Sequence, residues 1–228
     1  KPELPVPVLI SPESASSLAP AAQREFSPWD QILAIRWSPD GASLAVSAGD
    51  AVYILDAATL AEKTRFEPEV ATPGLDFSPD GRLLAAGGRD GMLHIWDIDS
   101  RREVYKFEAH QKSISSLMFS PDGKTLASAG YDAVARLWDA ESLENLGEMI
   151  GGTFAIPAIA FTPDGSSLAI VNGNVIRLRD VATSRFVVSL IGEGSFYSIA
   201  LHPEGNFLAS GDVNNNVLIW DLNAPPGP

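Results

Sequence analysis

A five-residue motif that recurs at a nearly constant interval constrains the fold of this chain more than any other feature. The motif is an aromatic residue followed by Ser or Thr, Pro, Asp and Gly, as in Phe77–Gly81 and Phe119–Gly123. A looser copy, Leu201–Gly205, ends the series. The prolines of the five copies are 40, 42, 42 and 40 residues apart. A fixed period of this length is typical of chains built from stacked structural repeats.

A second series of residues keeps the same period. Aspartates that end short apolar segments occur at intervals of 41, 42, 41 and 41 residues. They are Asp56, Asp97, Asp139, Asp180 and Asp221, and a Trp precedes the second, third and fifth of them. Two different motifs that share one period indicate true internal repeats.

Each repeat predicts about four short strands. Pro presets φ in a turn, Asp can bond its own backbone, and Gly supplies positive φ, so the first motif predicts a hairpin between two antiparallel strands. In the first repeat Ile32–Trp37 leads into this turn, and two more apolar segments follow it. Strands such as Val134–Trp138 are apolar on both sides apart from Arg136. This pattern predicts sheets that are covered on both faces by neighbouring sheets.

These motifs resemble those of the WD-repeat family of β-propellers, and the resemblance covers Gln23 to Asp221. It implies an all-β fold, a β-propeller of five four-stranded antiparallel blades. We expect a Pro-rich extension or linker over residues 1–22, the propeller over 23–222, and a Pro-rich tail over 223–228. Pro-rich ends are typical of extended linkers, which predicts a tethered propeller or one subunit of an assembly.

The resemblance also implies how the ring closes. In the family a repeat is offset from a blade, so the first and last segments share one blade. Gln23–Phe26 aligns with the outer strands of the later repeats, and no such strand follows Asp221. We therefore expect Gln23–Phe26 to pair with Val217–Asp221 and close a five-bladed ring. The alternative is that the chain is a fragment of a larger, seven-bladed WD-repeat protein, since seven is the commoner number in the family.

One repeat matches the buried hydrogen-bonded set of the family in full, through His110, Ser128, Asp132 and Trp138. The resemblance implies that these residues satisfy one another inside a blade. A hydrolytic Ser–His–Asp site is the alternative interpretation, but a nucleophile needs an exposed Ser beside an oxyanion hole, which this pattern does not supply.

The loops between the outer strand of one repeat and the next inner strand, and the turns between middle strands, are expected to form a partner-binding face. Aromatic residues and Arg often anchor protein interfaces. The expected binding residues on this face are Trp29, Arg89, Lys112, Tyr131, Phe154, Phe196 and Tyr197. The alternative is that some of them fill the central channel.

Composition narrows the partners and the chemistry. With 16 basic and 29 acidic residues the net charge is −13, and no basic stripe is visible, so nucleic acid is not an expected partner.

There is no cysteine, the three histidines are widely spaced, and no apolar segment is long enough to span a bilayer. We expect no metal and no cofactor. Asp212–Asn216 fits a tight turn better than a calcium loop. An exported or cell-envelope location is favoured over a cytoplasmic one.

The function expected from these features is a non-catalytic scaffold for protein–protein interaction, or a subunit of a larger complex. An enzyme or a sugar-binding propeller with a site in the central channel is the competing class. Such a site needs converging carboxylates or a metal, and the predicted inner strands offer only Asp30 and Asp76.

Overall fold

The computed structural model describes residues 21–150 and 152–223, and in this part of the chain strands are the only regular elements. The expected N-terminal extension, apart from its last two residues, and the tail from residue 224 onward lie outside the described residues. No helix in the described part is long and apolar enough to cross a membrane.

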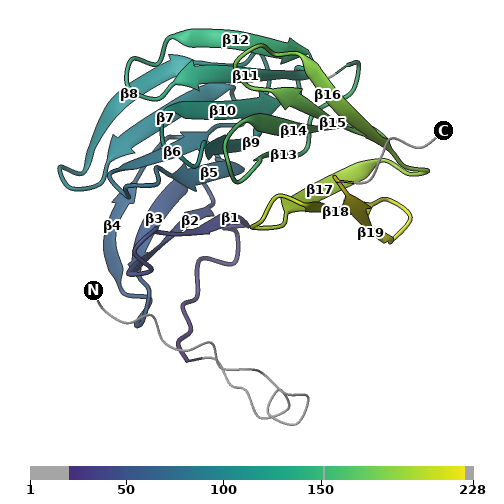
Figure 1. Cartoon of the computed structure of the whole chain (residues 1–228). Helices are drawn as coiled ribbons and strands as arrows, with labels where there is room; N and C mark the ends of the chain where they lie inside the picture. Colours follow the sequence, from purple (N-terminus) through teal and green to yellow (C-terminus); the bar gives the residue numbers. More distant parts are fainter. Residues whose placement is uncertain (1–20, 151, 224–228) are drawn as a thin grey trace.

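Within residues 21–150 and 152–223 nineteen strands form five antiparallel sheets, and in each sheet the strands follow one another in chain order (Figure 1). We call the sheets blades 1 to 5. Blade 1 contains β1 (Ile32–Trp37), β2 (Ser43–Ala48), β3 (Ala51–Asp56) and β4 (Glu62–Phe66). Blade 2 contains β5 (Gly74–Phe77), β6 (Leu83–Gly87), β7 (Met92–Asp97) and β8 (Arg102–Glu108). Blade 3 contains β9 (Ile114–Phe119), β10 (Thr125–Gly130), β11 (Val134–Asp139) and β12 (Asn145–Ile150). Blade 4 contains β13 (Ile159–Phe161), β14 (Ser167–Asn172), β15 (Val175–Asp180) and β16 (Phe186–Ile191). Blade 5 contains β17 (Phe196–Leu201), β18 (Phe207–Asp212) and β19 (Val217–Asp221).

The first repeated motif forms the hairpin turn between the first two strands of a blade. In blade 2 the Ser78 hydroxyl donates to Asp80 (2.6 Å) and accepts from the Leu83 amide (2.8 Å), while Asp80 also accepts from the Arg82 amide (3.0 Å). Gly81 follows with a φ of 75°, which favours glycine. The turns at Ser38, Ser120 and Thr162 repeat these bonds, so the motif is a structural one.

The second repeated motif, the aspartate series, anchors the turn between the third and fourth strands. Asp97 accepts from the Ser100 amide at 2.8 Å, and Asp139 accepts from the Ser142 amide at the same distance. Asp56 and Asp180 bond the amides three residues later in the same way. Both repeated motifs in the sequence therefore consist of residues that make hydrogen bonds within turns.

Each blade packs its apolar face on the next one. Val52 and Ile54 of blade 1 lie in one buried cluster with Leu75 and Phe77 of blade 2. Equivalent clusters join blade 2 to blade 3, blade 3 to blade 4, and blade 4 to blade 5. Outer strands contribute aromatic contacts, such as Phe66 on Trp96, with ring centroids 4.9 Å apart.

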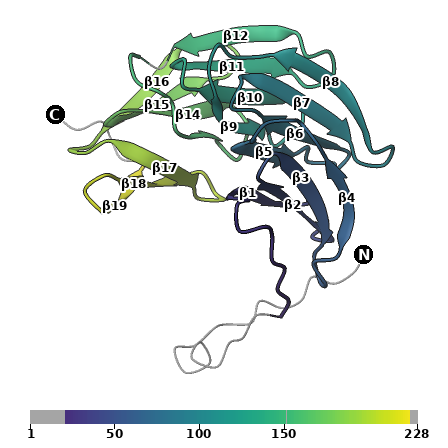
Figure 2. The same ribbon diagram turned by 180° about the vertical axis from the view of Figure 1, so that it is seen from behind.

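Blade 5 has three strands, and blades 1 and 5 are the two ends of an arc (Figures 1 and 2). The expected pairing of Gln23–Phe26 with β19 is wrong, because these residues form no strand and lie against blade 1 instead. Phe26 packs edge-on against Tyr53, with ring centroids 5.1 Å apart, and Arg24 pairs with Glu62 at 2.7 Å. These contacts are made with the other end of the arc, so the expected five-bladed closure is not formed.

Equivalent positions in two blades give a direct test of blade packing. Ile95 of β7 is fully buried under blade 3, whereas Ile219, at the same position of β19, is 66% exposed. We predict that Ile95→Ala lowers the free energy of unfolding by about 2–4 kcal/mol through lost burial and a cavity. Ile219→Ala should cost less than about 0.5 kcal/mol, as at other exposed sites. Urea denaturation of both variants measures this, and equal losses would contradict the packing described here.

Candidate functional site: the interior of blade 3 and the loop face

Four polar side chains form a hydrogen-bonded chain inside blade 3. The Trp138 indole donates to the Ser128 hydroxyl at 2.9 Å, and Ser128 lies 2.8 Å from Nε2 of His110. Nδ1 of His110 lies 3.0 Å from one carboxylate oxygen of Asp132. The Asp132 carboxylate can only accept, so Nδ1–H of His110 donates to it, and Nε2 is left to accept from the Ser128 hydroxyl. Each of these four side chains therefore has a hydrogen-bond partner.

Burial decides what this chain of residues can do. Ser128, His110 and Trp138 are all buried. Burial lowers the pKa of His110, against the opposing effect of Asp132, so the ring is neutral at pH 7. Burial alone would raise the pKa of Asp132, but hydrogen bonds from His110 and Arg136 outweigh it and the pKa lies below its ordinary value. A fully buried Ser cannot meet a substrate, so the arrangement satisfies buried polar groups rather than supplying a nucleophile.

Arg136 extends this network to the surface. Its guanidinium pairs with Asp132 at 2.7 Å and with Glu148 of β12 at 2.9 Å. Arg136, the one charged residue within Val134–Trp138, therefore balances the buried carboxylate of Asp132. In the sequence, Arg136 stands out only as an exception to the apolar pattern of this strand.

Blades 2 and 5 contain only part of this hydrogen-bonded set. Trp220 of blade 5 donates to Ser210 at 2.8 Å. In blade 2 Trp96 stacks on His94, which is completely buried and bonds Glu103 at 2.6 Å through Nδ1. Sequence reasoning missed the role of His94, because it lies inside a strand and not at the position that the family motif assigns to His.

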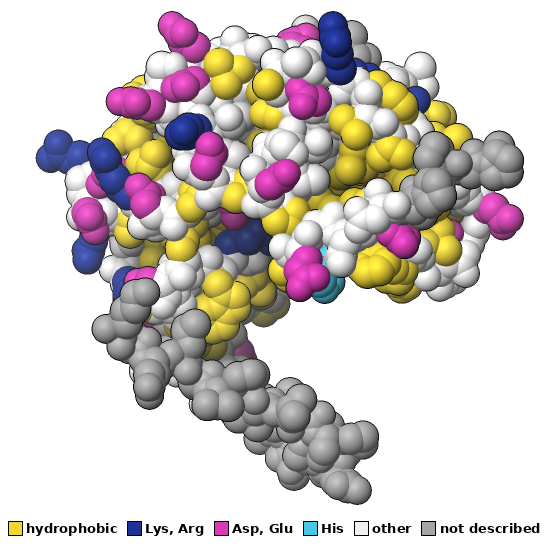
Figure 3. Space-filling view, in the orientation of Figure 1, with side chains coloured by type: hydrophobic (Ala, Val, Ile, Leu, Met, Phe, Trp, Pro, Cys, Tyr) yellow, Lys and Arg dark blue, Asp and Glu magenta, His cyan; other side chains and the backbone are white. Residues whose placement is uncertain are grey.

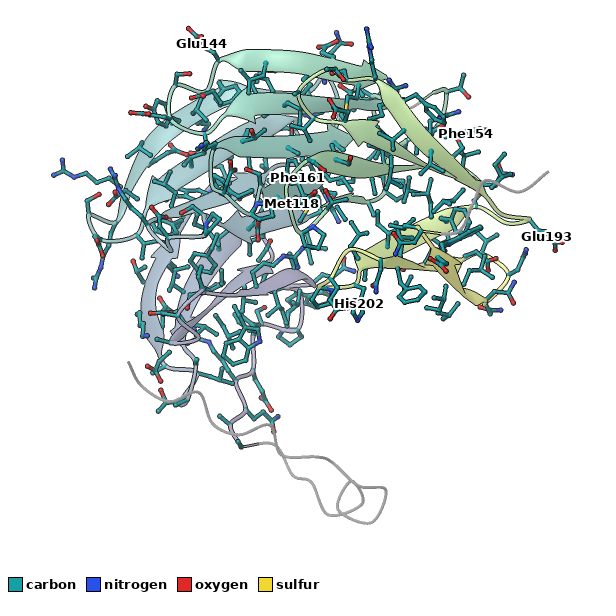
Figure 4. The ribbon with its side chains drawn as sticks, in the orientation of Figure 1. Met118, Glu144, Phe154, Phe161, Glu193 and His202 are labelled. Atoms are coloured by element: carbon teal, nitrogen blue, oxygen red, sulfur yellow. The ribbon has the colours of Figure 1, made fainter. Side chains whose placement is uncertain are left out.

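Side chains on the inner strands accept hydrogen bonds from backbone amides in the inner strand of the next blade. Asp76 of β5 accepts from the Phe119 amide at 2.9 Å, and Arg36 of β1 lies 3.8 Å from its other oxygen. Met118 occupies the corresponding place beside the Phe161 amide (Figure 4). Burial raises the pKa of Asp76 to about 6, against the effects of the Phe119 amide and Arg36. Asp76 thus connects two blades, and its carboxylate is held by a backbone amide and Arg36.

The loops expected to form the binding face lie together along one edge of the blades. The Ile114 amide bonds the Gly88 carbonyl (3.0 Å), which places the Arg89 turn beside the Lys112 loop. The Ile156 amide bonds the Gly130 carbonyl (3.1 Å), which places the Tyr131 turn beside the Phe154 loop. The Phe196 amide bonds the Gly173 carbonyl (2.8 Å), and this continues the row to blade 5.

Six of the seven expected binding residues are exposed: Trp29, Arg89, Lys112, Tyr131 and Phe154 on these loops, and Tyr197 near the start of β17. Phe154 is labelled in Figure 4. The seventh, Phe196, is 1% exposed and packs against Trp220 in the core between blades 4 and 5, so its assignment to the binding face is wrong. Phe196 begins β17, and strand alternation turns it inward while its neighbour Tyr197 points outward.

The expected turn at Asp212–Asn216 is formed. Asp212 accepts from the amides of Asn214 and Asn216, each at 2.9 Å, and Asn215 has a φ of 64°. The Asp212 carboxylate therefore accepts hydrogen bonds from the backbone of its own turn, as the aspartates of the other hairpins do.

Comparison with known proteins agrees with this architecture. Residues 73–97, 101–139 and 184–221 match the family model "WD domain, G-beta repeat". A solved structure titled "Crystal Structure of Mitotic Checkpoint Complex" contains a chain that superposes with a TM-score of 0.82 at 24% identity, covering 88% of this chain and 65% of that one. The fold is therefore that of a β-propeller.

Curated relatives match over shorter stretches. "Protein ANTHESIS POMOTING FACTOR 1" of Arabidopsis thaliana is 37% identical over 87 residues, which is 36% of this chain and 26% of the relative. "p21-activated protein kinase-interacting protein 1-like" of Danio rerio is 36% identical over 85 residues, 36% of this chain and 22% of the relative. "U5 small nuclear ribonucleoprotein 40 kDa protein" of Mus musculus is 44% identical over 41 residues, 18% of this chain and 12% of the relative. The matches thus span about a quarter or less of these relatives. Three stretches of this chain are therefore similar to WD repeats.

The hydrogen-bonded set of blade 3 predicts a specific loss of stability. His110→Ala leaves Ser128 and Asp132 without their buried partner, so we expect the free energy of unfolding to fall by about 1–3 kcal/mol. His202→Ala, in the exposed hairpin of blade 5, is the matched control and should change it by less than about 0.5 kcal/mol. Thermal and urea unfolding measure both, and a neutral His110→Ala would contradict the role given to this set.

Asp76 predicts a pH dependence with a defined sign. Its pKa is about 6 in the folded protein, against about 3.9 for an unperturbed Asp in the unfolded chain. The folded state therefore binds this proton more tightly, so its contribution to stability is present below about pH 4 and is lost as the pH rises through 6. Relative to Asp76→Asn, which keeps an acceptor for the Phe119 amide, the protein should lose about 2 kcal/mol between pH 4 and pH 7. Parallel pH profiles of the two proteins would contradict this assignment.

Proposed function

We propose that the protein is a non-catalytic interaction module that binds other proteins through the loop face of its blades. The observation that supports this most is that three aromatic side chains at one edge of blades 3 to 5 are exposed, namely Tyr131, Phe154 and Tyr197. Large aromatic side chains on loops held by a rigid sheet are typical anchors of protein interfaces.

The charge of the molecule favours a protein partner over a nucleic acid. The net charge is −13, and in Figure 3 Asp and Glu side chains are spread over the visible surface among the Lys and Arg side chains. A surface of this kind repels a phosphate backbone. On the loop face Arg89 and Lys112 supply local positive charge beside the aromatic row, which suits a partner segment with aromatic and acidic residues.

A catalytic role has little support from the site geometry. The residues that most resemble a catalytic set are buried in blade 3. The two carboxylates near the inner strands have different neighbours. Asp76 is held by the Phe119 amide, and Asp30 lies beside the Gly49 turn of blade 1. One similar protein is a component of the U5 small nuclear ribonucleoprotein, which supports a subunit role.

A larger ring is a second candidate for the arrangement of the blades. Both ends of the arc carry exposed apolar side chains, which a scaffold made of five blades alone would leave in water. In this interpretation the chain is part of a seven-bladed WD-repeat propeller that presents the same loop face.

The loop face is tested by capture of partners. We predict that the triple substitution of Tyr131, Phe154 and Tyr197 by Ala reduces proteins recovered from a lysate of the source cells by at least about tenfold, since anchor residues dominate binding energy. The melting temperature should not change, because all three side chains are exposed.

Phe186 and Val187, exposed on the outer strand β16, give the matched control. Their substitution by Ala removes apolar surface of similar size away from the loop face and should leave capture intact. Equal loss from both variants, or unchanged capture by the triple variant, would refute the proposed face.

A further inference from the structure

The outer strand of blade 4 differs in charge from the outer strands of blades 1 to 3. An outer strand is bonded on one edge only, and charged side chains often protect the other edge from pairing with a second chain. β4, β8 and β12 each contain at least one charged residue, such as Lys63, Lys106 and Glu148. β16, with the sequence Phe-Val-Val-Ser-Leu-Ile, contains none. Among the four outer strands that the structure describes, β16 is therefore the one without this protection.

The side chains along β16 are apolar and accessible. Phe186, Val187 and Ile191 are each more than half exposed. β16 runs along the outside of blade 4, and β15 is its strand neighbour within the described residues (Figures 1 and 2). An exposed edge that is apolar and uncharged is a template for the addition of another strand.

The outer edge of β16 also presents backbone groups. The Gly192 amide bonds the Asn174 carbonyl at 2.9 Å, and the pairing of β16 with β15 is regular over residues 188–191. Backbone groups of successive residues in an antiparallel strand point to opposite edges. Since Gly192 is directed toward β15, the amides and carbonyls of Ser189 and Ile191 are directed away from it.

We propose that β16 pairs with β16 of a second copy of this chain, about a two-fold axis at Ser189. The two fourth blades then join into one continuous antiparallel sheet. On this axis the outward backbone groups of Ser189 meet their own copies, and the exposed side chains of Val187 and Ile191 meet across the two strands. A register displaced by one residue would instead oppose outward groups to groups already bonded to β15.

The charged residues that flank β16 have opposite signs. Arg185 precedes the strand and Glu193 follows it, each four residues from Ser189. Both side chains are exposed, and Figure 4 shows Glu193 at the outer tip of blade 4. A two-fold axis at Ser189 brings Arg185 of each copy to the end where Glu193 of the other copy lies. Opposite charges at both ends favour this pairing and its antiparallel direction.

The same argument separates β16 from β19, the edge strand of blade 5. Residues 212–222, which contain β19, include two aspartates and no Lys or Arg, so two copies of β19 would bring acidic residues together. Residues 185–193 carry one charge of each sign. In a molecule with a net charge of −13, such a neutral edge lowers the repulsion between copies. An isologous contact of this kind closes at two copies, so it gives a dimer and not a filament.

Sedimentation velocity over about a hundredfold range of protein concentration tests the pairing. One strand on one strand is a small interface, so we expect a monomer–dimer equilibrium with a Kd on the order of 10–100 μM. Ser189→Pro removes an amide that points away from β15 and should weaken the dimer by at least about tenfold, since main-chain bonds supply most of the affinity in strand addition.

Ile219→Pro is the matched control for this variant. Ile219 is exposed on β19, and its amide points away from β18, because the Asp212 amide bonds the Asn216 carbonyl at the hairpin end and the register is regular. The substitution therefore makes the same change in the other apolar edge strand and should leave the Kd of the dimer unchanged. Edge positions of this kind tolerate Pro, so both variants should keep their melting temperature.

Reversal of the flanking charges tests the register without altering the strand. Arg185→Glu and Glu193→Arg each place like charges at both ends of the pair, and each should weaken the dimer by about three- to tenfold. A mixture of the two variants should form mixed dimers with nearly the original Kd, because every end then joins opposite charges. Both side chains are exposed, so folding should not change.

Three outcomes overturn the proposal. The first is a protein that stays monomeric at all these concentrations. The second is a dimer that Ile219→Pro removes and Ser189→Pro leaves intact, which would assign the contact to β19. The third is a mixture of the two charge variants that recovers no affinity. Substitution of Phe186 and Val187 by Ala keeps the outward backbone groups, and the pairing does not involve the loop face, so this proposal and the proposed function fail separately.

Discussion

Apolar packing between consecutive blades is the interaction on which the rest of the structure depends. Each blade is a small sheet with two apolar faces, and neither face is stable in water without a neighbour. Four interblade clusters meet this need within the chain. The hairpin and turn motifs set the length and pleat of each sheet so that these faces align. The hydrogen-bonded set of blade 3 then satisfies the polar groups that the packing buries.

Much of the fold could be predicted from the sequence, because the repeated turns have local causes. The bonds among Ser78, Asp80 and Gly81 lie within a few residues of one another, so the motif alone locates the hairpin. The roles of His110, Ser128, Asp132 and Trp138 could also be anticipated, since they sit at fixed places in one repeat. The position of Gln23–Phe26 could not, because spacing identifies an outer strand without saying which blade receives it.

The exposure of the residues assigned to the proposed binding face was only partly predictable. Tyr131 and Phe154 are exposed as expected, because they lie in loops after the ordered strands end. Phe196 is buried, since it lies as far before the hairpin Pro203 as the buried Ile114 lies before Pro121, and so begins its strand with the ring turned inward. The role of His94 could not be predicted, because a buried polar residue within one strand does not recur in the other repeats. The exposure of Trp37 depends on what lies beside blade 1, and no local pattern contains that information.

Hydrogen exchange on the unaltered protein tests the central claim most directly, namely that interblade packing stabilises the arc and that its two ends are uncovered. Amides of β1 and β19 should exchange much faster than those of the equivalent strands β9 and β11 in blade 3, which have neighbours on both sides. The predicted result is a gradient with slow exchange in blades 2 to 4 and fast exchange at the two ends. Equally slow exchange in β1, β9, β11 and β19 would contradict the account, because it would show that the ends are already covered.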